Sequence, residues 1–139
     1  MEVDMQVASP NILAVLLMAV VYMVIASIWY SEAVFGKLWL KACGKEGEKC
    51  CKPTMKQHIS AFIVAFVTAY VLSCMINHMG VNDAMTGART AFWAWLGFVA
   101  TTMYSGVVWC KKPLTTYFVD AGFLLVTFII WGAVFGVWQ

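Results

Sequence analysis

The stretch that decides the fold is Leu114–Trp138, LTTYFVDAGFLLVTFIIWGAVFGVW, in which Asp120 carries the only charge. An α-helix rises about 1.5 Å per residue, so about 20 residues cross the roughly 30 Å hydrocarbon core of a bilayer. Three further runs are as apolar and contain no Asp, Glu, Lys or Arg; they are Ile12–Ser31, Ile59–Met79 and Thr90–Cys110. The last of them directly follows Arg89. The expected fold class is therefore an all-α membrane protein with four transmembrane helices, forming one domain with spans at about 11–31, 58–79, 87–110 and 114–138.

The composition points the same way. Hydrophobic residues make up 63% of the chain and charged residues 12%, about half the charged share of an ordinary soluble domain. A soluble chain of this length has too little interior to hide four apolar helices. The net charge is only +2, whereas a nucleic-acid-binding protein needs a concentrated basic surface. We therefore expect the lipid bilayer as a partner and no nucleic acid. The acidic start does not resemble a secretory signal, so we expect the first run to be retained.

The lysines predict the orientation of the chain. The loop after the first run holds six lysines and the third loop holds Lys111 and Lys112, whereas the other side carries only Arg89. Cytoplasmic loops of membrane proteins are enriched in Lys and Arg. We therefore expect both lysine-bearing loops in the cytoplasm and both termini on the non-cytoplasmic side, in a plasma or inner membrane. The alternative is the reverse or a mixed orientation.

Four of the five cysteines fall on the predicted cytoplasmic side; the set is Cys43, Cys50, Cys51 and Cys110, with Cys74 inside the second run. Because the cytoplasm keeps thiols reduced, we expect free or lipid-modified thiols. A metal site of His58 with three of these cysteines is an alternative. However, adjacent cysteines lack the spacing typical of zinc ligands, so we expect neither metal nor cofactor. In the reverse orientation, disulfides would become the better expectation.

The chain resembles two related halves. Tyr30-Ser31 recurs as Tyr104-Ser105, and Cys50–Pro53 recurs as Cys110–Pro113. This pattern predicts two sequence-related helical hairpins, with chance similarity between apolar segments as the alternative. The first half has an insertion within a cytoplasmic segment at about 32–57. Its start, Glu32–Ala42, combines apolar residues with Trp and Lys and predicts a short interfacial helix.

Small residues predict where helices approach one another, because membrane helices associate through close contact and hydrogen bonds. The stripes comprise Ala61, Ala65, Ala69 and Ser73 in the second run, Gly97, Thr101 and Ser105 in the third, and Gly132 and Gly136 in the fourth. They suit either a monomeric bundle or an oligomer. Four helices leave little central space, so a conducting path favours a homo-oligomer.

Polar residues form two predicted layers. The cytoplasmic layer consists of Asp120, Tyr30, Tyr104, Ser105 and Ser60, with Tyr30, Tyr104 and Ser105 as expected partners of the acid. The outer layer consists of Asn77, His78, Asp83 and Arg89, the last two as a candidate ion pair. An acid inside a span is costly and faces the protein interior or water. Asp120 therefore either binds a proton or cation on a transport path, or locks helix register through hydrogen bonds.

The aromatic residues do not suggest a reaction. Trp29, Trp39, Trp109 and Trp138 fall near span ends and indicate an interfacial belt, whereas Trp93, Trp95 and Trp131 lie deeper, facing lipid or filling the bundle. No phosphate loop, Ser-His-Asp set or paired carboxylates is present in the sequence. We therefore expect no catalytic residues and no enzyme activity.

Three segments carry a family resemblance. They are Trp29-Tyr30-Ser31-x-x-x-Phe35-Gly36-Lys37-x-Trp39, then Gly97-Phe98-Val99-Ala100-Thr101-Thr102, and Ala121-Gly122-Phe123 with Gly132-Ala133. Together they resemble an uncharacterised family of small four-helix membrane proteins, known as a domain of unknown function. The resemblance covers nearly the whole chain and implies four spans and membrane residence, without an activity. The cysteine-rich insertion and the double lysine before Pro113 depart from the family pattern.

Three functions remain open from the sequence. The first is an oligomeric channel or transporter for protons, ions or a small solute. The second is a non-transporting membrane component that binds a partner protein or lipid. The third, with the least support, is an enzyme acting on a membrane substrate. Flux across reconstituted vesicles separates the first two.

Overall fold

The computed structural model describes residues 9–42, 44 and 54–139. The regular elements of these residues are all helices, without strands. The elements are α1 (Ile12–Trp29), α2 (Gly36–Ala42), α3 (Met55–His78), α4 (Ala84–Ala94), the π-helical segment η1 (Trp95–Ala100), α5 (Thr101–Cys110) and α6 (Leu114–Val137). α4, η1 and α5 form one continuous span, Ala84–Cys110, called the third span below. This span and α1, α3 and α6 are all long and apolar enough to cross a membrane, which confirms the four-helix membrane fold.

Two helices begin several residues before the apolar runs that predicted them, because a capping residue lies ahead of each run. α3 begins at Met55 because Thr54 and Gln57 form a capping box, in which the Thr54 hydroxyl accepts from the Gln57 N–H at 3.3 Å and the Gln57 side-chain carbonyl accepts from the Thr54 N–H at 2.9 Å. The third span begins at Ala84 because Asp83 caps it. The predicted interfacial helix over 32–42 begins only at Gly36, since residues 30–35 form a turn.

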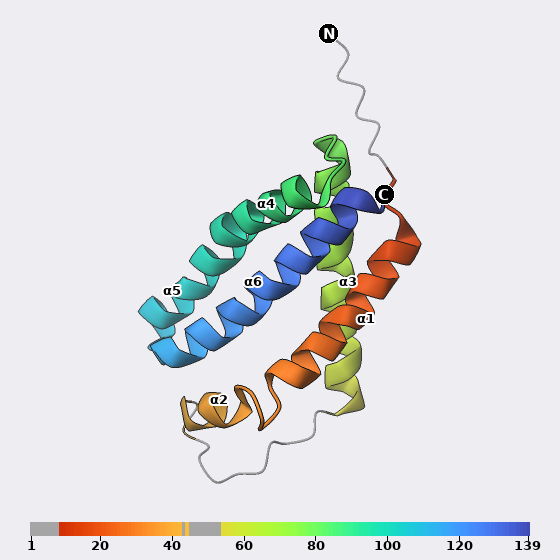
Figure 1. Cartoon of the computed structure of the whole chain (residues 1–139). Helices are drawn as coiled ribbons and strands as arrows, with labels where there is room; N and C mark the ends of the chain where they lie inside the picture. The colour runs from red at the N-terminus through yellow and green to blue at the C-terminus, as the bar shows by residue number, and fades with distance from the viewer. Residues whose placement is uncertain (1–8, 43, 45–53) are drawn as a thin grey trace.

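The lysines of the described residues gather at one end of the molecule. α2, the start of α3 and the turn between α5 and α6 lie there, while the start of α1 and the C-terminus lie at the other end (Figure 1). We call the first the lysine end; it carries Lys37, Lys41, Lys56, Lys111 and Lys112. The arrangement matches four crossings with the start of α1 and the C-terminus on one side. The side of the membrane on which the lysine end lies stays a prediction.

The closest helix pair is α4 and α6, which run side by side (Figure 1). Glycines allow this approach. A Cβ atom on Gly132 would lie 2.5 Å from the Ala91 Cβ, and one on Gly87 would lie 3.1 Å from the Gly136 Cα. Real side chains do not fit at such distances, so the glycines at the crossing set the separation of the two helices.

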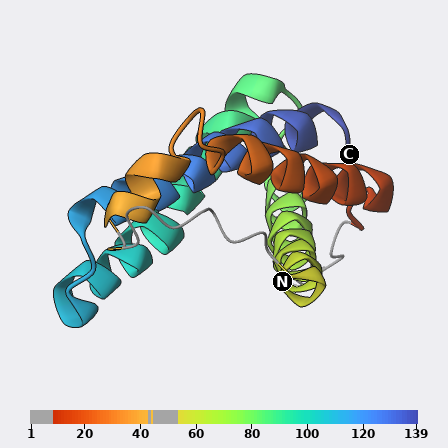
Figure 2. The same ribbon diagram turned by 90° about the horizontal axis from the view of Figure 1, so that it is seen from below.

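The second helix pair, α1 and α3, packs through small residues. Ala65, Ala69 and Ser73 of α3 are buried, and α1 contributes Ala14 and Ala19 to the same core. α3 also contacts α6, but it diverges from the third span toward the lysine end (Figure 2). The third stripe, Gly97, Thr101 and Ser105, is exposed, and no atom lies within 4 Å of a Cβ built on Gly97.

The helix pairing agrees with two hairpins, one containing α1 and α3 and one containing the third span and α6. Their sequence relationship stays a prediction. Cys43, Cys50 and Cys51, and most of the predicted polar turn at 44–49, lie outside the described residues.

Candidate functional site

A tight turn after α1 places α2 against α6. The carbonyl of Ser31 accepts from the N–H of Val34 at 3.1 Å and from that of Gly36 at 2.9 Å, and the Phe35 N–H donates to the Trp29 carbonyl at 3.1 Å. A Cβ on Gly36 would lie 2.7 Å from the Ser31 carbonyl oxygen, so a larger residue would force the turn open. The Trp-Tyr-Ser…Phe-Gly motif therefore forms the turn that reverses the chain and packs α2 against α6.

This turn delivers Tyr30 to Asp120. The Tyr30 hydroxyl donates to Oδ1 of Asp120 at 2.5 Å, joining the end of α1 to α6. The carbonyls on either side of the acid are also occupied. The Trp29 indole N–H donates to Val119 O at 3.1 Å, and the Trp95 indole N–H donates to Ala121 O at 3.1 Å. The end of α1 and η1 thus both bond to a single turn of α6.

Aromatic rings surround this turn. The ring centroid of buried Phe123 lies 5.1 Å from that of Tyr22, 5.5 Å from that of Tyr30 and 6.3 Å from that of Trp29. Trp39 of α2 stands edge-to-face with Tyr30 at 6.0 Å. Its indole N–H is buried without a hydrogen-bond partner. We call these rings together with the acid the Asp120 site; its members are Asp120, Tyr22, Trp29, Tyr30, Trp39 and Phe123.

Two more hydrogen bonds connect α6 to its neighbours. Trp131, 1% exposed, donates from its indole N–H to the Met18 carbonyl at 3.0 Å. The Tyr117 hydroxyl donates to the carbonyl of Ala100, at the end of η1, at 3.0 Å. A carbonyl in a helix has a second lone pair available for such a donor. In a lipid environment these bonds and close packing hold helices together, so α6 is the central helix of the fold.

The structure joins only part of the predicted cytoplasmic layer. Tyr30 contacts Asp120 as expected, but the described hydrogen bonds link neither Tyr104 nor Ser105 to the acid, and that part of the expectation was wrong. The Tyr104 ring is exposed and packs against Tyr117 at 5.5 Å, while the Ser105 hydroxyl donates to the Thr102 carbonyl at 2.6 Å. Similar depth did not bring these residues together because α1 and α5 lie on opposite sides of α6 (Figure 1).

Ser60, the remaining member of that layer, is exposed on the first turns of α3. α3 packs on α1 and α6 through its later turns, where its buried residues lie. Ser60 is therefore not a member of the Asp120 site.

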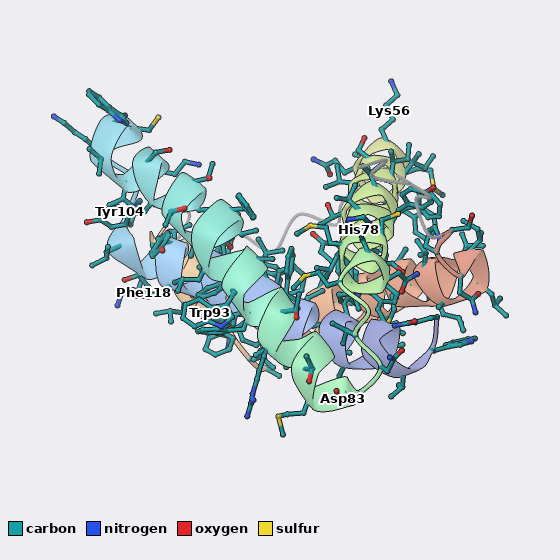
Figure 3. All side chains as sticks on the ribbon, turned by 90° about the horizontal axis from the view of Figure 1, so that it is seen from above. Lys56, His78, Asp83, Trp93, Tyr104 and Phe118 are labelled. Atoms are coloured by element: carbon teal, nitrogen blue, oxygen red, sulfur yellow. The ribbon has the colours of Figure 1, made fainter. Side chains whose placement is uncertain are left out.

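The predicted outer layer is not a single cluster. Asp83 caps α4, its Oδ2 accepting the Thr86 N–H at 2.8 Å. This bond to Thr86 holds the pKa of Asp83 below its usual value, with a smaller contribution from the positive charge of Arg89. The described contacts of these two side chains include no ion pair. His78 is exposed at the end of α3, on a different element from Asp83 (Figure 3).

Asn77 lies between that exposed end and the core. Its Oδ1 atom and the Ser73 hydroxyl are buried without a hydrogen-bond partner in the structure. They are one helical turn apart on α3. The sequence placed Ser73 among packing residues and Asn77 in the polar layer, and nothing in the sequence marked either as lacking a partner.

Sequence reasoning missed Tyr22, Trp29, Trp39 and Phe123 as members of the Asp120 site, and Trp95 as a neighbour that bonds to the backbone beside it. Trp29 was interpreted as a belt residue, and Trp95 as lipid-facing or space-filling, yet both donate to the backbone beside Asp120. Trp93, on the same span as Trp95, is 67% exposed on the outer surface (Figure 3). The one available signal for Trp29 was its place directly before Tyr30 in the motif that forms the turn, and no comparable signal marked Trp95.

Metal binding has no candidate among the described residues, which contain no group of three or more His, Cys, Asp or Glu side chains able to hold an ion. Cys74 and Cys110 are free thiols. The adjacent pair Cys50-Cys51 lies outside the described part of the chain.

Four membrane-spanning helices, joined by hydrogen bonds to backbone carbonyls and carrying one acid in the fourth span, define a multi-pass integral membrane protein. The chain belongs to the family described as "Protein of unknown function (DUF1761)", whose pattern matches residues 13–136. This match confirms the resemblance to an uncharacterised family. Searches of curated proteins and of solved structures found no match.

Proposed function

We propose that this protein is a channel or transporter for protons, cations or a small solute, with Asp120 as the ion-binding group on the path. The observation that carries the proposal is the placement of this acid. Asp120 is half-buried inside α6, and its described hydrogen bond comes from a neutral tyrosine hydroxyl. Neither α1 nor α6 contains Lys or Arg. An acid without a basic partner is costly in a membrane, and such groups mark ion or substrate pathways.

The proposal includes assembly into a homo-oligomer. Side chains fill the centre of a four-helix bundle, and Trp131 and Phe135 are fully buried here. A path through the protein therefore needs a second subunit. The exposed stripe of Gly97, Thr101 and Ser105 supplies a surface on which another helix can approach closely.

The test is flux into reconstituted vesicles under an imposed membrane potential, with protons read by an internal pH-sensitive dye and other cations and small solutes read by uptake of radiolabelled tracers. We expect Asp120→Asn to lower the rate by about tenfold or more, since it removes the charge that binds the ion. Asp83→Asn is the matched control, because Asn caps a helix as well as Asp does. An unchanged flux in Asp120→Asn would show that Asp120 does not bind the transported ion, although the protein would still be a transporter. Absence of flux in the wild-type protein would contradict the proposal.

A second candidate is a non-enzymatic, non-transporting membrane component. It is favoured by the same exposed stripe on the third span, since a partner helix or a lipid can cover it as well as a second copy. In this case Asp120 locks the register of α1 and α6 through Tyr30. Crosslinking from a cysteine placed at Gly97 in native membranes tests this candidate. One stoichiometric partner protein would support it, and a crosslinked dimer of the chain itself would support the first.

A further inference from the structure

The turn at residues 111–113, between α5 and α6, carries a lysine whose side chain folds back along the third span. A Cβ atom on Gly106 would lie 3.4 Å from Cδ, 3.7 Å from Cε and 3.8 Å from Nζ of Lys112. Gly106 precedes the last residue of α5, Cys110, by four positions, which is about 6 Å along the axis at the rise of a helix. The Lys112 ammonium group therefore lies beside the last turn of α5 and does not extend away from the end of the helix.

The backbone of this turn directs the side chain. Lys111 adopts a left-handed conformation with a φ of 53°, and its N–H donates to the Gly106 carbonyl. The Lys112 N–H donates to the same carbonyl at 3.4 Å. These two bonds bend the chain over the end of α5, so the Lys112 stem runs back across the position at which Gly106 has no side chain. A larger residue at position 106 would fill the space that the stem occupies.

The surface around this ammonium group faces lipid. None of the residues of α5 is buried, and Val108 and Trp109 are 56% and 83% exposed. An exposed Trp near the end of a span is typical of the headgroup layer, and long lysine stems place their charge at the same layer. The Lys112 ammonium group therefore lies at the level at which the phosphates of a bilayer are found.

The charge of Lys112 has no partner within the described part of the chain. Its ammonium group makes neither an ion pair nor a hydrogen bond there, although a lysine near a helix end could bond to the last carbonyls. All five lysines of the lysine end are exposed, and among the described residues there Glu32 is the single exposed acid. The positive-inside rule accounts for charge on one side of the membrane, but it does not require a lysine to fold back onto a span.

We propose that Lys112, together with Lys111, binds the phosphate of an anionic phospholipid in the leaflet at the lysine end. Anionic lipids are favoured over phosphatidylcholine because the phosphate of phosphatidylcholine is already neutralised by its own ammonium group. Each lysine near a membrane surface adds to the attraction for anionic lipids. The proposal concerns a lipid-facing surface of α5 and does not depend on transport, so a failure of lipid binding and a failure of flux are separate results.

The test is a titration of the detergent-solubilised full chain with phosphatidylglycerol, in which native mass spectrometry gives the Kd of the first bound lipid. We expect phosphatidylglycerol to bind more tightly than phosphatidylcholine. Lys112→Gln should weaken the binding of phosphatidylglycerol by about fivefold, which is the effect of one lysine near a membrane surface. Lys56→Gln is the control for charge and should leave the Kd unchanged, because Lys56 lies at the start of α3, on a helix that diverges from the third span (Figure 3).

Gly106→Leu tests the position of the Lys112 side chain without altering the charge. Leucine favours a helix more than glycine does, so α5 should stay intact while the new side chain displaces the Lys112 stem. We expect a loss of about fivefold here as well. Val108→Leu is the matched control, since residues two positions apart on a helix face different directions.

Two results would overturn the proposal and leave the lysines as an orientation signal. They are equal binding of the two lipids, and an equal effect of Lys56→Gln and Lys112→Gln. Unchanged binding in Gly106→Leu would overturn it too, because the position of the ammonium group would then not matter. Displacement of the lipid by inorganic phosphate at constant ionic strength would indicate a site for a free anion and would also contradict the proposal.

Discussion

The bond between the Tyr30 hydroxyl and Asp120 is the contact on which the site depends at the residue scale. It joins residues 90 positions apart in the sequence and requires a sharp turn directly after α1. Depth in the membrane was sufficient to predict Tyr30 as a partner, because depth follows from helix rise. The same argument wrongly selected Tyr104, because depth does not determine the side of a helix to which a residue points. The rotation of a helix about its axis is fixed by packing with its neighbours.

Removal of the Tyr30 hydroxyl tests that bond. We expect Tyr30→Phe to destabilise the fold by about 1–2 kcal/mol, since hydrogen bonds to a charged group are stronger than the average interhelical bond in membranes. Equilibrium unfolding in mixed micelles measures the free energy. Tyr104→Phe is the matched control, because its hydroxyl has no described partner and its ring is exposed. In a double-mutant cycle with Asp120→Ala, which removes the acceptor, the Tyr30→Phe effect should disappear; an additive cycle would show that the two side chains are not coupled.

The cap of the third span predicts a pH effect at Asp83. The Thr86 N–H stabilises the charged carboxylate, so the pKa in the folded protein lies below the usual value of 3.8. The cap is therefore fully formed above about pH 4 and is lost as the pH falls through the lowered pKa. The Thr86 amide chemical shift, followed by NMR in micelles, should titrate with a midpoint below 3.8. In Asp83→Asn that titration should vanish while the helix start is kept, and a midpoint above the usual value would contradict the assignment.

At the scale of elements, the glycines of α4 and α6 explain how two helices approach so closely. Gly132 and Gly136 were predicted from their spacing alone. Their partner Gly87 was not, because it lies before the apolar run that marked the third span. The π-helical segment was not predicted either. No residue pattern in Trp95–Ala100 distinguishes the i to i+5 hydrogen bonds of a π-helix from the i to i+4 hydrogen bonds of an α-helix. Its ends are fixed by the Trp95 and Tyr117 bonds, which depend on α6.

A pair of glycine variants tests this packing. Gly132→Ala should destabilise the fold by about 1–3 kcal/mol, because its methyl group would lie 2.5 Å from the Ala91 Cβ and the helices would have to separate. Gly97→Ala should be neutral or slightly stabilising, since no atom lies within 4 Å of the added Cβ in the monomer. Unfolding in mixed micelles compares the two variants. Equal losses would show that the close contact between α4 and α6 is absent.

At the scale of the whole molecule, hydropathy alone determined the number of spans, because no soluble arrangement of this chain hides four apolar helices. It did not determine how the spans pack. The contact of α3 with α1 and α6, and its divergence from α5 (Figure 2), follow from which turns carry Ala65, Ala69 and Ser73. Those residues were predicted as a packing stripe, but a stripe does not name the helix that it contacts.

The lysine end also decides the orientation of the proposed site. Positive charges stay preferentially in the cytoplasm, so Lys111 and Lys112 should face the cytosol and Asn82 the opposite side. In a background without native cysteines, we expect a membrane-impermeant maleimide added to intact cells to label Asn82→Cys, and to label Lys112→Cys only after permeabilisation. Both positions are exposed in the structure, so lack of access would not come from burial. Because α2 and the start of α6, whose second turn carries Asp120, lie toward the lysine end (Figure 1), this result would place the site on the cytoplasmic side of the membrane. The opposite labelling pattern would make the Asp120 site face the exterior.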